Sequence, residues 1–180
     1  MSAPHVLPLT EFVHRTRAQR GLGRAVPFFD PADGGIHARV LFLLEAPGPK
    51  AVTTGFVSRD NPDPSARNLR RLLRPLSRRD TVLWNVVPWY VGTGERITPV
   101  GEQDLETSQP WLIELLRILT AVRVAVLVGR KAQRVKAEIA AVWGWKLSEM
   151  CHPSRRVFNS WPERWAEWER SVEGISRRLR

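Results

Sequence analysis

The chain has 180 residues, 43% of them hydrophobic, so it is long enough for one well-buried domain and too short for two. The formal net charge of +10 indicates a polyanionic partner such as nucleic acid, although basic proteins without such a partner also exist. The single cysteine, Cys151, excludes an internal disulfide and a cysteine-rich zinc or iron–sulfur site. No apolar run approaches the roughly 18 residues of a membrane span, and we expect a cytoplasmic protein without membrane contact.

Residues 1–38 are expected to form an N-terminal flap on the single domain 1–180, with a short helix from about Leu9 to Arg20. Turn-forming residues follow from Pro27 to Gly35. The arginines of this segment could contact phosphate, but a solvated helix face accounts for them at least as well. They are Arg15, Arg17, Arg20 and Arg24.

An unbroken apolar run from Val40 to Leu44 predicts a strand that is buried on both faces. Glu45 follows it at once, and the rigid Ala46 to Pro49 loop comes next. Functional groups in α/β folds often lie at strand ends, but a plain strand-to-helix turn with an incidental Glu45 is an equal alternative.

A loop from Lys50 to Pro62 contains Gly55 and Phe56. Asp63 and Pro64 then predict a helix start, with the aspartate as N-cap and the proline at the first helical position. Leucines recur at helical spacing behind them and predict the buried face of this helix. They are Leu69, Leu72, Leu73 and Leu76.

Thr81 to Trp89 is β-branched and aromatic, which predicts a second buried strand, and Asn85 is its only polar residue after Thr81. A buried amide is costly unless it is hydrogen-bonded, so Asn85 either fastens a neighbouring loop or contacts a ligand. A helix from about Glu102 to Thr120 follows, and Pro110 is expected to kink or split it.

The last third of the chain continues the alternation of strand and helix. Two further strands are expected, and between them a helix from Lys131 to Val142. The strands are Arg123 to Gly129 and Lys146 to Met150. The final helix, within 160–180, presents tryptophans that we interpret as core packing. They are Trp161, Trp165 and Trp168.

This order of elements predicts the fold class and the place of the site. Strands that alternate with helices favour an α/β fold with three layers, α/β/α, around a central and mainly parallel four-stranded sheet. Such folds bind ligands at the carboxyl ends of their strands. Three of the polar features lie at those ends: Glu45, Asn85 and the loop that begins at His152.

The order and spacing of four motifs resemble the uracil-DNA glycosylase superfamily, especially its Glu-Ala-Pro-Gly branch. The motifs are Glu45-Ala46-Pro47-Gly48, Gly55-Phe56, Asn85 and His152-Pro153-Ser154. The likeness extends from Val40 to Asn159. It implies a monofunctional DNA glycosylase that hydrolyses the N-glycosidic bond of uracil, or of another deaminated base, after the base is flipped out of DNA.

The resemblance also implies roles for individual residues. Asn85 would read the uracil edge, and Phe56 would stack on the flipped base beside Ala46. His152 would donate to uracil O2, while Glu45 would orient or deprotonate the attacking water. The remaining implied contacts are to DNA. The flanking phosphates would be bound by Pro47, Gly48 and Ser154. The minor groove would be entered by Arg155 and Arg156, and the wedge would be Val157 or Phe158.

The chain departs from the family pattern at several positions. Ala46 replaces the aspartate that handles the water in the best-known branch, and Leu44 replaces the usual glycine. The Glu-Ala-Pro-Gly branch carries an iron–sulfur cluster on four cysteines, which one cysteine cannot hold, so we expect no metal and no cofactor. The Lys-Arg-Arg-Ile-His insertion of the branch that traps DNA covalently is not found. We expect a monomer, and a catalytically silent binder of damaged or abasic DNA is the alternative function.

Overall fold

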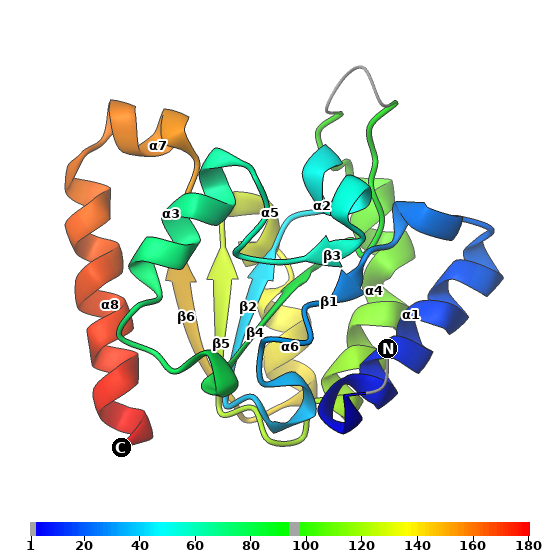
Figure 1. Ribbon diagram of the computed structural model, residues 1–180, viewed down its shortest axis with the longest axis horizontal. Coiled ribbons are helices and arrows are strands. Elements are labelled where there is room, and N and C mark those ends of the chain that lie inside the picture. The colour runs from blue at the N-terminus through cyan, green and yellow to red at the C-terminus, as the bar shows by residue number, and fades with distance from the viewer. Residues whose placement is uncertain (1–2, 94–97) are drawn as a thin grey trace.

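The structure, a computed structural model, describes residues 3–93 and 98–180. Its central sheet has four strands in the order β4-β2-β5-β6, and every neighbouring pair is parallel (Figure 1). This confirms the predicted α/β class with a parallel four-stranded sheet. The strands are β2 (Val40–Leu44), β4 (Thr81–Asn85), β5 (Val124–Val128) and β6 (Lys146–Met150). A separate pair, β1 (Phe28–Phe29) and β3 (Phe56–Val57), is also parallel.

Helices cover both faces of the sheet. They are α1 (Leu7–Arg20), α2 (Pro49–Thr54), α3 (Pro64–Leu72), α4 (Glu102–Ile118), α5 (Arg130–Gln133), α6 (Lys136–Val142), α7 (Arg155–Ser160) and α8 (Glu163–Leu179). The chain crosses from β2 to β4 in one direction and from β4 through β5 to β6 in the other. Because such crossovers are right-handed, α3 lies on one face and α4 to α6 on the opposite face.

The remaining helices complete these two layers. Helix α8 packs against α3, whereas α1 packs against α4 on the other side of the molecule (Figure 1). The chain reverses its direction of travel around β2, and all four strands of the sheet point toward the same edge. Ligands of open α/β sheets bind at such a switch point. No helix within the described ranges is both long and apolar enough to cross a membrane.

The start of α3 follows the predicted capping chemistry. The Asp63 side chain accepts a hydrogen bond of 2.9 Å from the Ala66 amide, and Pro64 occupies the first helical turn. All of the leucines predicted for its inner face are buried. They are Leu69, Leu72, Leu73 and Leu76. This helix start also forms part of the wall of the cavity described below.

The N-terminal segment is an integral layer of the core, which corrects the expectation of a flap. Phe12 is fully buried, and its ring meets the edges of Trp84 and Trp111 at centroid distances of 6.1 and 6.4 Å. Arg15 pairs with Glu114 of α4 at 2.6 Å, so it holds two helices together. Arg17 donates to the Val26 carbonyl at 2.8 Å, again within the fold.

Three expected elements differ in the structure. The expected loop from Lys50 to Pro62 contains α2 and β3, and the helix expected from Lys131 to Val142 is divided into α5 and α6. The second strand ends at Asn85 rather than Trp89. Beyond Asn85 the chain stays buried, and its amides bond to the end of β2 and the residue after it: Val86 donates to the Leu44 carbonyl at 2.8 Å, and Val87 to the Glu45 carbonyl at 3.0 Å.

The tryptophans of the last helix region have unequal surroundings. Trp168 is buried, and its indole donates to the Cys151 carbonyl at 3.0 Å. Trp165 is half-buried and meets the Phe158 ring at 4.8 Å. Trp161 is 53% exposed, so its assignment to core packing was wrong. It lies at the corner between α7 and α8, where neither helix covers it.

Candidate active site

A cavity of about 560 Å³ opens at the carboxyl ends of β2 and β4. The loop after β2, the segment after β3, the start of α3 and His152 surround it. Six of the residues predicted for the site are among its lining residues: Glu45, Ala46, Pro47, Gly48, Asn85 and His152. Leu44, which replaces the glycine of the family pattern, is half-buried and also contributes to the lining.

Asn85 is placed in the cavity wall by the register of the sheet. It ends β4 directly opposite Leu44 of β2, and only 3% of its surface is exposed. Its Nδ2 has no hydrogen-bond partner among the described residues. An unpaired buried donor costs about 1–3 kcal/mol. An acceptor atom of a ligand in the cavity would satisfy this donor.

Glu45 is held by backbone groups on two sides. Its Oε1 accepts a hydrogen bond of 3.3 Å from the Val100 amide, and its carbonyl accepts one of 3.0 Å from Val87. The residue is half-buried and lines the cavity. These two hydrogen bonds therefore orient Glu45, the residue that follows β2.

His152 follows β6 and lines the cavity together with the loop after β2. Burial lowers the pKa of its imidazole, while the nearby carboxylates of Glu45 and Asp63 act in the opposite direction. The ring is therefore neutral at pH 7. The next residue is tied to α3, because Asn68 Nδ2 donates to the Pro153 carbonyl at 2.9 Å. A neutral imidazole with this support can donate one hydrogen bond into the cavity.

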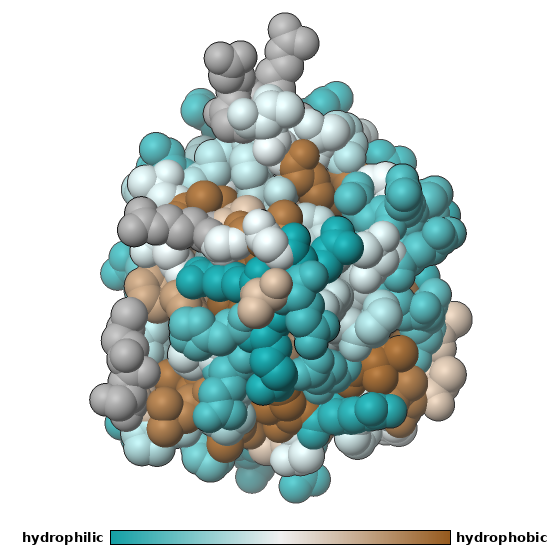
Figure 2. Space-filling view, turned by 90° about the vertical axis from the view of Figure 1, so that its right-hand side faces the viewer, coloured by the Kyte–Doolittle hydropathy of each residue, from teal (hydrophilic) through white to brown (hydrophobic). Residues whose placement is uncertain are grey.

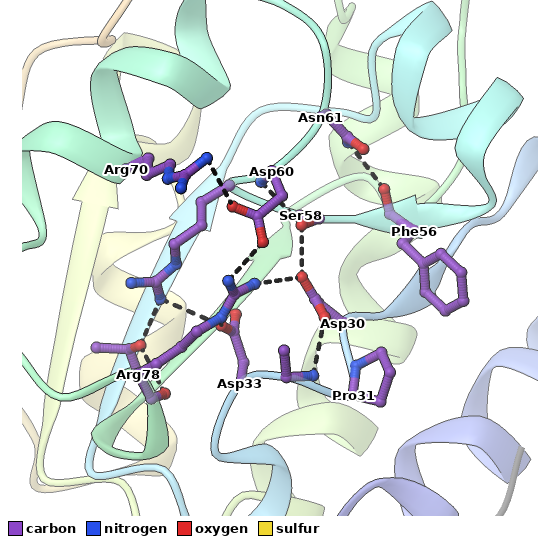
Figure 3. A network of polar contacts seen from close by, with 12 residues as sticks. Asp30, Pro31, Asp33, Phe56, Ser58, Asp60, Asn61, Arg70 and Arg78 are labelled. Atoms are coloured by element: carbon purple, nitrogen blue, oxygen red, sulfur yellow. Dashed lines mark hydrogen bonds and ion pairs between the residues drawn. The ribbon is translucent and has the colours of Figure 1, made fainter.

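Phe56 does not line the cavity, although its neighbours Val57 and Ser58 do. Its ring lies beside Phe28, with 6.5 Å between the centroids, and Figure 3 shows it directed away from the polar residues labelled there. Its carbonyl accepts a hydrogen bond of 2.9 Å from Asn61. Stacking of Phe56 on a base stays a prediction that this arrangement does not support.

The predicted DNA contacts after His152 lie on and before α7. The Ser154 hydroxyl accepts a hydrogen bond of 3.3 Å from the Val157 amide and so caps this helix, a role that sequence reasoning did not include. Arg155 and Arg156 are both exposed on its first turn. Of the two wedge candidates, Phe158 packs against Trp165, which leaves Val157 as the less constrained side chain.

A polar network behind the cavity was missed by sequence reasoning. Ser58 lines the cavity, and its hydroxyl donates to the Asp30 carboxylate in the β1 region. Arg78 joins Asp30, Asp33 and Asp60, with 2.9 Å from its Nε to Asp33 (Figure 3). Residues 18 to 48 positions apart in sequence are therefore joined at one wall of the cavity. No local pattern could indicate these pairs.

Asp33 is the most buried member of that network, with 2% of its surface exposed. Burial raises the pKa of its carboxyl group to about 6, although the neighbouring Arg59 and Arg78 guanidiniums oppose the shift. Arg59, itself 5% exposed, reaches Asp33 at 3.3 Å and donates to the Thr81 hydroxyl at the start of β4. This pair connects the network to the strand that carries Asn85.

Comparison with known proteins agrees with this geometry. The sequence profile of the uracil DNA glycosylase superfamily matches residues 31–170. A candidate uracil DNA glycosylase from Methanosarcina acetivorans, solved by NMR in solution, superposes with a TM-score of 0.52 at 14% identity. The alignment covers 77% of this chain and 91% of that one, and at this identity it shows a shared fold. None of the curated proteins compared with the chain matches it. Because the family profile covers well over half of the residues, the chain belongs to the uracil DNA glycosylase superfamily.

Proposed function

We propose that this protein is a monofunctional DNA glycosylase that removes uracil flipped out of DNA and leaves an abasic site. The observation that carries the proposal is the buried Asn85 amide, whose Nδ2 has no partner among the described residues and lines the same cavity as Glu45 and His152. An unpaired buried donor destabilises the fold, and a ligand that supplies an acceptor for the Asn85 Nδ2 removes this cost.

The chemistry of Asn85 favours uracil over cytosine. Its amide donates to O4 and accepts from N3–H of uracil, whereas cytosine presents an amine and an unprotonated nitrogen at the same two places. Apolar neighbours cannot make this distinction, because both rings have the same shape. A site with a hydrogen-bonding requirement also rejects ligands that leave its buried groups unpaired.

Bond cleavage separates a cationic sugar from an anionic base. The C1′–N1 bond breaks, its electron pair leaves with N1 of uracil, and the sugar takes on oxocarbenium character. Neutral His152 would donate a hydrogen bond to uracil O2, where negative charge grows. Burial, which lowers the pKa of His152, keeps the ring uncharged for this role.

Glu45 would act on the sugar side of the reaction. Its carboxylate stabilises the positive charge at C1′ and takes a proton from the water that adds there. The hydrogen bond from Val100 holds Oε1 and leaves the second oxygen for the water. Ala46 offers no carboxylate of its own, so this mechanism depends on Glu45 alone for water activation.

Oligonucleotides with one uracil, single-stranded or paired with guanine or adenine, test the proposal. Incubation followed by heating in alkali should cleave the strand at the uracil position and leave a thymine-containing control intact. A panel with hypoxanthine, xanthine and mispaired thymine then measures base preference. Salt-sensitive binding without cleavage of any of these strands would contradict the proposal and favour a silent binder of damaged DNA.

A further inference from the structure

A second groove of about 860 Å³ adjoins the cavity on the far side of Glu45 and His152. Glu45, His152 and Pro99 line both the cavity and the groove, so these residues lie between the two. The groove continues past Gly129 at the start of α5 to the corner between α7 and α8. The cavity and the groove are therefore neighbours that meet at Glu45, Pro99 and His152.

Trp161 is the unusual residue of the groove lining. Leu7, Val142 and Trp161 are the large hydrophobic side chains exposed within the described ranges, and of these only Trp161 lines either hollow. Its backbone is fixed on both sides: its amide donates to the Val157 carbonyl at 2.9 Å, and its carbonyl accepts from the Arg164 amide at 3.1 Å. The indole is therefore presented to solvent from a rigid corner.

Two cations of the groove lining can bind an anion. Arg130 is exposed and Lys131 half-buried, and both follow Gly129 at the end of β5. Besides Glu45, which the groove shares with the cavity, two carboxylates line it, and both have close cationic partners: Glu149 pairs with Lys136 at 2.5 Å, and Glu167 with Arg164 at 2.7 Å. Lys131 lies 3.9 Å from Glu102, a carboxylate that Arg134 holds more closely. Arg130 and Lys131 are thus available to a phosphate.

We propose that the groove binds the nucleotide next to the extruded one, with its base stacked on Trp161 and its phosphate beside Arg130 and Lys131. An exposed aromatic face among cations matches the stacking platforms of proteins that bind single strands. The proposal rests on the proposed function and narrows its substrate class. A neighbouring base in a duplex would first have to leave its own stack and its paired base, which costs further free energy, so single-stranded DNA is the favoured substrate.

The test measures binding without cleavage, on single strands that carry 2′-fluoro-2′-deoxyuridine, an analogue whose N-glycosidic bond resists hydrolysis. Each strand has either a normal base or an abasic spacer next to the analogue, on the 5′ or the 3′ side. Fluorescence anisotropy gives Kd for the wild type, Trp161→Ala and Trp161→Phe. Leu7→Ala is the matched control, because Leu7 is similarly exposed but lies outside both hollows.

Stacking on Trp161 predicts that Trp161→Ala weakens binding roughly 5- to 150-fold when the neighbouring base is present. The abasic spacer should weaken wild-type binding by a similar factor, and Trp161→Ala should then add nothing further. Trp161→Phe should retain most of the affinity, and Leu7→Ala all of it. An equal loss with and without the neighbouring base, or no loss at all, would overturn the proposal.

Two more arms separate the proposal from its alternatives. Arg130→Gln should lower the slope of log K against log salt by about 0.7, the value for one phosphate contact on a single strand, whereas Arg177→Gln at the far end of α8 should not. A Trp161→Ala loss confined to duplex substrates would identify a wedge and refute stacking of a single strand. The analogue is not cleaved, so the binding measurement does not depend on catalysis. Failure of the uracil-release assay would therefore refute the proposed function without deciding whether Trp161 stacks on the neighbouring base.

Discussion

Gly129 and His152 approach each other so closely that a Cβ atom at Gly129 would lie 3.3 Å from the Cβ of His152. Gly129 also has a φ of +89°, a left-handed conformation that L side chains rarely adopt. The turn after β5 therefore sets the position of the imidazole that follows β6. The first prediction concerns this contact.

Gly129→Ala should lower kcat for uracil release by roughly 2- to 10-fold, since the added Cβ displaces His152 by a few tenths of an ångström and a misplacement of 1 Å costs about 100-fold. Gly129 has a φ of 89° and a ψ of 160°, a region that almost only glycine adopts, so the backbone strain of an alanine there should cost about 1–3 kcal/mol in unfolding free energy. Single-turnover kinetics and urea denaturation measure the two effects. Gly144→Ala is the control, because no atom lies within 4 Å of a Cβ built there. Full activity in Gly129→Ala would show that His152 does not need this neighbour.

Replacing Asn85 by leucine should separate stability from function. Leucine keeps the branch at Cγ and its larger volume extends into the adjoining cavity, while the change removes a buried donor without a partner among the described residues, so the unfolding free energy should stay level or rise by about 1 kcal/mol. Uracil release should fall at least 100-fold, because O4 and N3 lose their partner. A large loss of stability with activity retained would mean that Asn85 is a structural tie.

The lowered pKa of His152 predicts how activity responds to acid. The imidazole is already neutral at pH 7, so its protonation should begin to reduce kcat only below pH 6.5, the ordinary value for histidine. Below that pH the unfolded chain binds the proton more readily, so this group also lowers the unfolding free energy as the pH falls. Glutamine does not titrate, so in His152→Gln this contribution to the pH dependence of the unfolding free energy should be absent. A rate that rises as pH falls through 6.5 would contradict the assignment of a neutral donor.

Asp33 should produce a pH dependence of the opposite sign. Burial raises its pKa to about 6, so between pH 4 and pH 6 the folded protein holds a proton that the unfolded chain has lost. The unfolding free energy should therefore fall by about 1 kcal/mol through this group between pH 5 and pH 7. Asp33→Asn does not titrate, so its stability relative to the wild type should improve over that interval. Parallel curves for the two proteins would refute the raised pKa.

Features that are written in one short stretch of sequence could be predicted. The apolar run before Glu45 and the Asp63–Pro64 pair each specify their structure through neighbours in the chain, and both appear in the structure as expected. The convergence of Glu45, Asn85 and His152 followed from the parallel sheet, because parallel strands bring their carboxyl ends to one edge. The fold class and the outline of the site were available from these residues.

Features that depend on contacts between distant segments could not be predicted from the sequence. Trp161 has the helical spacing of a core residue, yet the break between α7 and α8 turns it outward. The apolar run around Asn85 continues to Trp89, but the strand ends at Asn85, opposite Leu44, the last residue of its partner strand β2. Ser58 and Asp30 meet only after β1 and β3 pair. Tertiary contacts decide each case.

The most direct test of the account is single-turnover uracil release by the wild type, Glu45→Gln and His152→Gln on a single-stranded oligonucleotide. Glu45→Gln keeps the size of the side chain and a hydrogen-bond acceptor for Val100, but removes the charge and the base. Each variant should bind the strand like the wild type and release uracil at least 100-fold more slowly. Release at the wild-type rate by both variants would contradict the central claim that this cavity cleaves the base with Glu45 and His152.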